Sequence, residues 1–100
     1  MEFEWDEGKR QNNLQKHNVD FEDIKPVFEQ ANKTVQSLDN RQDYGETRIN
    51  LLGEIQNKVY CVVYTKRNSK YRIISARRAN RRETRKYYQS LLGRMGTDEG

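Results

Sequence analysis

A group of residues near the N-terminus combines two lysines, an asparagine and the chain's only histidine. Their spacing places all four on one face of a helix: Lys9, Asn13, Lys16 and His17. Histidine exchanges protons near neutral pH, so this face is a candidate for acid–base catalysis. The alternative is an ordinary exposed face on which His17 complements the negative end of the helix dipole.

A strongly basic segment, residues 66–94, carries eleven Lys or Arg side chains and one acid, Glu83. Residues 1–65 carry eight basic and twelve acidic side chains, so the positive charge gathers in the last third of the chain. Eight of the eleven cations are Arg, which can bind phosphate through two parallel hydrogen bonds. The segment therefore suits a nucleic acid or an acidic protein surface, unless it is simply a solvated face.

Arg72, Arg77 and Arg78 lie on the last predicted strand and just after it. An Arg at a strand end, beside the start of a helix, is well placed to bind a phosphate. The alternative is that these guanidinium groups pair with acids from the first half of the chain.

Glu83 and Tyr87 stand one helical turn apart in the same basic segment. The surrounding cations should lower the pKa of Glu83, which would act as a base, or as a helix cap and counter-ion. Tyr87 would donate a hydrogen bond to Glu83, stack on a nucleobase, or fill the core.

Several classes of protein are excluded or disfavoured by what the sequence lacks. A single cysteine, Cys61, allows no internal disulfide and no cysteine-based zinc site, and one histidine excludes sites with two. No apolar run approaches the roughly 20 residues of a membrane span, and the acidic N-terminus is unlike a signal peptide. We expect a cytoplasmic protein without metal, cofactor or membrane contact.

The hydrophobic periodicity predicts one α+β domain over residues 1–93, followed by a flexible tail over 94–100. The elements expected are a short strand around Phe3 and Trp5, helices over 7–17 and from 20 or 22 to 31, strands over 34–38, 47–55, 58–66 and 70–77, and a basic helix from Asn80 to Leu92. Brief connectors between the strands favour an antiparallel four-stranded meander. A polar loop is expected over 39–45.

Helix ends are marked by capping residues. Asp6 can cap the first helix and Asn18 can end it, while Asn80 and Glu83 form a variant of the capping box. Gly93 suits the end of the last helix. Pro26 lies inside the second predicted helix, where it would remove a hydrogen bond, so the start of that helix stays open.

The strand over 58–66 is apolar on both faces, which predicts a central strand covered by helices on at least one side. One face carries Val59, Cys61, Val63 and Thr65, and the other carries Tyr60, Val62 and Tyr64.

Several stretches together resemble the BrnT family of bacterial type II toxins. The matching positions over residues 3–88 are Phe3-Glu4-Trp5-Asp6, Lys9, Asn13, Lys16-His17, Val19-Asp20-Phe21, Val27-Phe28, Glu46, Arg48, Gly53, Thr65, the run Arg72-Ile73-Ile74-Ser75-Ala76-Arg77-Arg78-Ala79, Glu83 and Tyr87. The resemblance implies a RelE-like fold and ribonuclease activity without metal. It also implies a BrnA-type antitoxin as the partner, and we expect the two proteins to form a heterotetramer. In that complex only the antitoxin would contact operator DNA.

The resemblance, together with the basic segment, leads us to expect a metal-independent endoribonuclease that inhibits translation and cleaves RNA by transesterification through the 2′-hydroxyl. Arg48, Arg72 and Arg77 would converge on the phosphate, His17 or Glu83 would be the base, and Tyr87 would stack or donate a proton. Further RNA contacts are expected from Lys9, Lys16, Arg78, Arg81, Arg82 and Arg85. The alternative function is a basic binding module for nucleic acid or an acidic protein, without catalysis.

Overall fold

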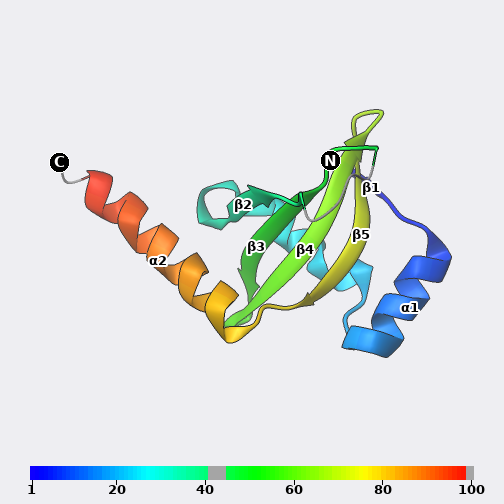
Figure 1. The fold of residues 1–100 in the computed structure, drawn as a ribbon, viewed down its shortest axis with the longest axis horizontal. Coiled ribbons are helices and arrows are strands. Elements are labelled where there is room, and N and C mark those ends of the chain that lie inside the picture. The colour runs from blue at the N-terminus through cyan, green and yellow to red at the C-terminus, as the bar shows by residue number, and fades with distance from the viewer. Residues whose placement is uncertain (41–44, 99–100) are drawn as a thin grey trace.

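The computed structural model describes residues 1–40 and 45–98, and it confirms the α+β class (Figure 1). The expected loop over 39–45 falls partly on residues 41–44, outside this described part. In chain order the elements are β1 (Glu2–Glu4), α1 (Glu7–His17), the 3₁₀ helices η1 (Phe21–Glu29) and η2 (Ala31–Lys33), β2 (Val35–Leu38), β3 (Ile49–Ile55), β4 (Lys58–Arg67), β5 (Lys70–Arg78) and α2 (Arg81–Asp98). Among the described residues, no helix is both long enough and apolar enough to cross a membrane.

The five strands form one sheet in the order β1-β5-β4-β3-β2. Strands β2 to β5 pair antiparallel with their neighbours in the chain, as the short connectors predicted. Two-residue turns close the longer hairpins, with positive φ at Gln56 and Asn57 and again at Asn68 and Ser69. Strand β1 runs parallel to β5, so the sheet is mixed.

Helix α1 begins and ends where the capping residues predicted. The Asp6 side chain accepts a hydrogen bond from the Lys9 backbone N–H at 3.0 Å. Asn18 takes the left-handed conformation (φ 57°), and its N–H bonds to the Leu14 carbonyl. The chain therefore turns sharply after His17 and holds that residue at the very end of the helix.

The expected second α-helix is wrong in type, because η1 is a 3₁₀ helix that starts after the Asp20 cap. In an α-helix Pro26 would leave one carbonyl without a donor and its ring would clash with the preceding turn. The 3₁₀ helix has three residues per turn, so Phe21, Ile24 and Val27 lie above one another, and all three are fully buried.

The predicted end of the last helix at Gly93 is also wrong, since α2 continues to Asp98. A glycine such as Gly93 costs about 1 kcal/mol relative to alanine inside a helix, which is too little to end the helix by itself. No proline follows Gly93 in the sequence, so nothing forces the helix to stop there. The capping box at the other end is confirmed. The Glu83 N–H donates to the Asn80 side chain at 2.8 Å, and the Asn80 N–H donates to the Glu83 carboxylate at 2.9 Å.

Two apolar clusters lie on opposite faces of the sheet. Val62 and Tyr64 pack with the buried residues of η1 on one face, where Phe28 contacts Tyr64 edge-on with ring centroids 5.1 Å apart. Val59 and Cys61 pack on the other face against Tyr87 of α2. The two faces predicted for β4 are confirmed, and the strand is covered on both of them.

Candidate active site

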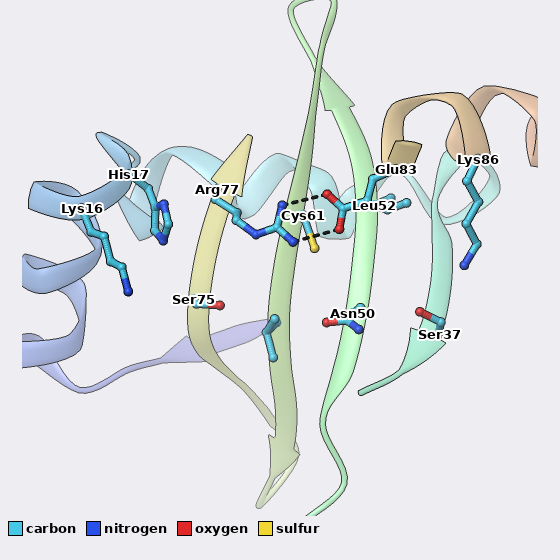
Figure 2. A pocket seen from close by; sticks show the side chains of 11 residues that line it. Lys16, His17, Ser37, Asn50, Leu52, Cys61, Ser75, Arg77, Glu83 and Lys86 are labelled. Carbon is cyan, nitrogen blue, oxygen red and sulfur yellow. Dashed lines mark hydrogen bonds and ion pairs between the residues drawn. The ribbon is translucent and has the colours of Figure 1, made fainter. Parts of the chain in front are cut away.

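A pocket of about 580 Å³ lies on the sheet face that carries Cys61, between the end of α1 and the start of α2 (Figure 2). Its size is within the range usual for small-molecule and nucleotide sites. The lining residues come from six elements of the fold: Lys16, His17, Ser37, Asn50, Leu52, Cys61, Val63, Ser75, Arg77, Glu83 and Lys86.

The floor of the pocket consists of two rows of residues that the strand register places side by side. One row runs Ser37, Asn50, Val63 and Ser75 across β2, β3, β4 and β5. The next row runs from Leu52 on β3 to Cys61 on β4, and it ends at Arg77 on β5, where the wall of the pocket begins. The first row is mostly uncharged and polar, and the second is apolar until Arg77 at the end of β5.

Lys16 and His17 form the wall on the α1 side, and Asn13 fixes this helix to the sheet. The buried Asn13 amide donates to the Ala76 carbonyl at 2.7 Å and accepts from the Ala76 N–H at 3.0 Å. It also donates to the Val19 carbonyl at 2.9 Å, directly after the turn that ends α1. One side chain therefore holds both the helix end and β5, and it sets the position of His17 relative to Ser75.

Arg77 and Glu83 form the wall at the start of α2. The guanidinium donates two parallel hydrogen bonds to the carboxylate, at 2.7 and 2.8 Å (Figure 2). The carboxylate also accepts the Asn80 N–H of the capping box. The Arg77 hydrogen bonds, more than any other interaction, hold the pKa of Glu83 below its usual value, so this carboxylate stays ionised.

The pocket is cationic, with Lys16, Arg77 and Lys86 set against the single carboxylate of Glu83. Neither lysine forms an ion pair with the residues the structure describes, which leaves its charge to attract an anion. A smaller cavity of about 190 Å³ adjoins the first along α1 and shares Lys16, His17 and Ser75 with it. Lys9 lines this extension, so the basic face predicted for α1 continues out of the pocket.

The expected convergence of three arginines is wrong, because Arg77 alone among them lines the pocket. Arg72 is bound to Glu4 on the parallel strand β1, at 3.1 Å. Arg48 is bound to Glu46 at 3.2 Å, two residues before it. For Arg72 the alternative reading, pairing with an acid of the first half of the chain, is confirmed.

Tyr87 also lies outside the pocket. It is 2% exposed, packs in the core between the sheet and α2, and donates its hydroxyl to the Lys33 carbonyl at 2.7 Å. Burial is the main cause of its raised pKa, which keeps the hydroxyl protonated. Of the three roles that the sequence left open for Tyr87, the geometry matches that of a core residue.

The other predicted RNA contacts, at the end of β5 and on α2, do not line the pocket. Arg78 lies with its guanidinium 5.8 Å from the centroid of the Tyr60 ring, toward the opposite face of the sheet. Three exposed arginines stand on the first turns of α2: Arg81, Arg82 and Arg85. They place exposed positive charge on the same helix turns that carry Glu83 and Lys86 of the pocket.

Several lining residues were missed by the reading of the sequence. Ser37, Asn50 and Ser75 are ordinary strand residues, and only the register across four strands brings them together. Lys86 was one cation among many in the basic segment. Within residues 1–40 and 45–98, no group of three or more His, Cys, Asp or Glu side chains has metal-binding geometry.

The fold and site define a small α+β protein with a cationic pocket suited to a phosphate ester. The family described as ribonuclease toxin, BrnT, of type II toxin-antitoxin system matches residues 5–83, so this chain belongs to the BrnT toxin family. The match begins directly after β1, ends at Glu83 in the wall of the pocket, and includes every residue that lines the pocket except Lys86. No curated protein matches the chain. Family membership indicates RNA as the substrate and an antitoxin as the partner.

Proposed function

We propose that this chain is a metal-independent endoribonuclease whose active site is the pocket between α1 and α2. The observation that carries the proposal is the gathering of a histidine, three cations and one ionised carboxylate around a single cavity. Transesterification by the 2′-hydroxyl needs a base, cations for the phosphorane-like transition state and an acid for the leaving oxygen, and this set supplies all three.

His17 is the proposed base. Its position at the end of α1 is fixed by the Asn18 turn and by Asn13, and its ring lines the cavity. Glu83, the other candidate, already accepts hydrogen bonds from Arg77 and from the Asn80 N–H, so it is less able to accept a proton from RNA. We therefore assign Glu83 the role of holding Arg77.

The scissile phosphate lies among Arg77, Lys16 and Lys86 in this proposal. The 2′-oxygen attacks phosphorus and gives its proton to His17, and the bond from phosphorus to the 5′-oxygen breaks. A lysine ammonium lining the pocket supplies the proton that the leaving oxygen takes up. The products are a 2′,3′-cyclic phosphate and a 5′-hydroxyl end.

The surrounding residues have supporting roles. Arg81, Arg82 and Arg85 bind the RNA backbone along α2, as Lys9 does along α1, while Arg78 contributes charge from the far side of β5. Arg48, Arg72 and Tyr87 act by holding the fold, each through a contact with its own partner.

The test is cleavage of single-stranded RNA by the purified chain in EDTA, with the product ends identified by mass spectrometry. Arg77→Ala should lower the rate at least about tenfold, because it removes a charge from the transition state. Arg67→Ala is the matched control, since it removes the same charge from an exposed position at the hairpin end of β4. A requirement for added metal, or equal rates in the two variants, would overturn the mechanism. RNA affinity without any cleavage would favour the binding-module alternative.

We also propose that the partner is a BrnA-type antitoxin, that two copies of each chain assemble in the cytoplasm, and that operator DNA is contacted only through the antitoxin. The toxin–antitoxin family supports a protein partner of this kind. Co-expression followed by light scattering measures the mass, which should equal two toxins and two antitoxins. An equimolar dimer of the two chains, or operator binding by the toxin alone, would contradict this assembly.

A further inference from the structure

The floor of the pocket carries polar groups that the proposed chemistry does not use. Ser37, Asn50 and Ser75 are uncharged, whereas the charged groups of the pocket lie on its walls. In the view of Figure 2 these three side chains lie in a row below Arg77 and Glu83. The pocket therefore separates a cationic wall, suited to phosphate, from a neutral polar floor.

Asn50 stands near the middle of this floor, and its side-chain amide is free to bind a ligand as far as the described residues are concerned. Its amide makes no hydrogen bond to any residue in the described part of the chain. The side chain is half-buried on β3, and it is flanked by Ser37 and Val63 in the strand register. An amide offers one acceptor oxygen and two N–H donors, so Asn50 presents both kinds of group to whatever occupies the cavity.

The spacing of the strands puts Asn50 at a useful distance from the wall. Neighbouring strands lie about 4.8 Å apart, so Asn50 on β3 lies roughly 10 Å across the sheet from Ser75 on β5. A nucleotide whose phosphate meets the cations can extend its base over this distance. Leu52, Cys61 and Val63 provide apolar surface beneath the flat face of the base.

The types of residue that line the pocket also indicate which part of a nucleobase the protein would contact. No aromatic side chain lines the pocket, among the residues that the structure describes, so stacking on a protein ring is not available there. Recognition must then use the edge of the base. The pairing that geometry favours for an asparagine amide is a bidentate one with adenine.

We propose that the floor is a nucleobase subsite in which Asn50, assisted by Ser37, selects adenine next to the cleaved bond. This inference rests on the proposed function, because it takes the occupant of the pocket to be RNA. A good bidentate pair discriminates against the wrong base by about tenfold to a hundredfold.

The test uses two readouts. The first is the cleavage rate of uridine-rich RNA oligonucleotides that contain a single adenosine, guanosine or cytidine. The second is the affinity of the same oligonucleotides with a 2′-deoxy sugar throughout, which cannot be cut by the 2′-hydroxyl. We expect the chain to prefer the adenosine oligonucleotide at least about tenfold in both. Asn50→Ala should abolish the preference, and Asn50→Asp should move it toward guanosine, because a carboxylate only accepts and guanine offers two adjacent N–H donors.

Gln36→Ala is the control variant. Gln36 is an exposed amide on β2, next to Ser37, but it lines a different cavity on the opposite face of the sheet. This variant should keep the adenosine preference. Thermal unfolding checks that each variant folds. If Asn50→Ala does not fold, Asn50→Ser, which keeps a polar side chain at this position, replaces it.

The outcomes separate this inference from the proposed function. Equal affinity for all oligonucleotides, or a preference that survives Asn50→Ala, would overturn the subsite even if RNA is cleaved. A preference in affinity that Asn50→Ala removes, in a chain that cuts no RNA, would support the subsite and contradict the ribonuclease proposal.

Discussion

The ion pair between Arg77 and Glu83 allows a quantitative test of how the wall of the pocket is held. Glu83→Gln removes the charge but keeps an oxygen for the Asn80 N–H, so the capping box can persist. Hydrogen bonds to charged groups contribute about 1.5–3 kcal/mol each when buried, and less when exposed. With side-chain exposures of 37% for Arg77 and 24% for Glu83, we expect the variant to lose about 1 kcal/mol of unfolding free energy at neutral pH.

The loss should depend on pH in a direction that the pKa of Glu83 fixes. Hydrogen bonds from Arg77 hold this pKa below its usual 4.5 in the folded chain. A carboxyl group of this kind stabilises the fold above its unfolded pKa, and the contribution disappears as pH falls through the folded pKa. The difference between the native chain and Glu83→Gln should therefore be constant at pH values well above 4.5 and shrink as the pH falls below 4.5 through the lower folded pKa.

Urea unfolding followed by circular dichroism at several pH values measures this difference directly. Glu22→Gln is the matched control, because Glu22 is 52% exposed and forms an i,i+3 pair with Lys25 at 2.9 Å. This exposed pair should be worth less than about 0.5 kcal/mol. If the two variants lose the same stability at pH 7, or if the Glu83→Gln loss is unchanged in acid, the Arg77–Glu83 pair does not hold the wall of the pocket.

Three further substitutions test the scaffold around the pocket. Gly53→Ala should destabilise the fold by about 1–3 kcal/mol, seen as a lower Tm, because the added Cβ would lie 2.5 Å from Val27 Cγ1; an unchanged Tm would show that η1 can move away from β3. Asn13→Ala should cost about 2–4 kcal/mol in urea unfolding and also slow RNA cleavage, since it leaves buried groups of Val19 and Ala76 unpaired; full activity would separate α1 from the site. Tyr87→Phe should cost about 1 kcal/mol and leave cleavage unchanged, whereas a tenfold slower rate would return Tyr87 to the chemistry.

Local features of the fold could be predicted from the sequence because each depends on a few neighbouring residues. Asp6 and Asn18 mark the ends of α1, and Asn80 with Glu83 marks the start of α2, since a cap satisfies backbone groups within one turn. The hairpins followed from short connectors in the same way. The errors at Pro26 and Gly93 arose where a local rule allows two outcomes: a 3₁₀ helix accommodates the proline, and a glycine can continue a helix as well as end one.

The pocket itself could be predicted only in part. Lys16 and His17 were identified by helical spacing, and Arg77 with Glu83 by their place at a strand end and a helix start. The floor depends on long-range register, and no local pattern aligns Ser37, Asn50 and Ser75 across four strands. The pairing of Arg72 with Glu4 also depends on long-range strand register, because Glu4 lies opposite Arg72 only when β1 pairs parallel with β5.

The net positive charge of the pocket comes from its two lysines, not from the arginines that are most numerous in the basic segment. Arg77 is neutralised by Glu83, and Arg72 by Glu4, so the fold pairs these guanidinium groups with acids of its own. Lys16 and Lys86 form no ion pair within the described residues, and they face the cavity from α1 and α2. In the proposed mechanism, an approaching phosphate would therefore be attracted first by the two lysine ammonium groups, and Arg77, held by Glu83, would orient it once it has arrived. Most arginines of the basic segment therefore lie outside the pocket, so a count of charges along the sequence locates the basic segment but not the groups that face the cavity.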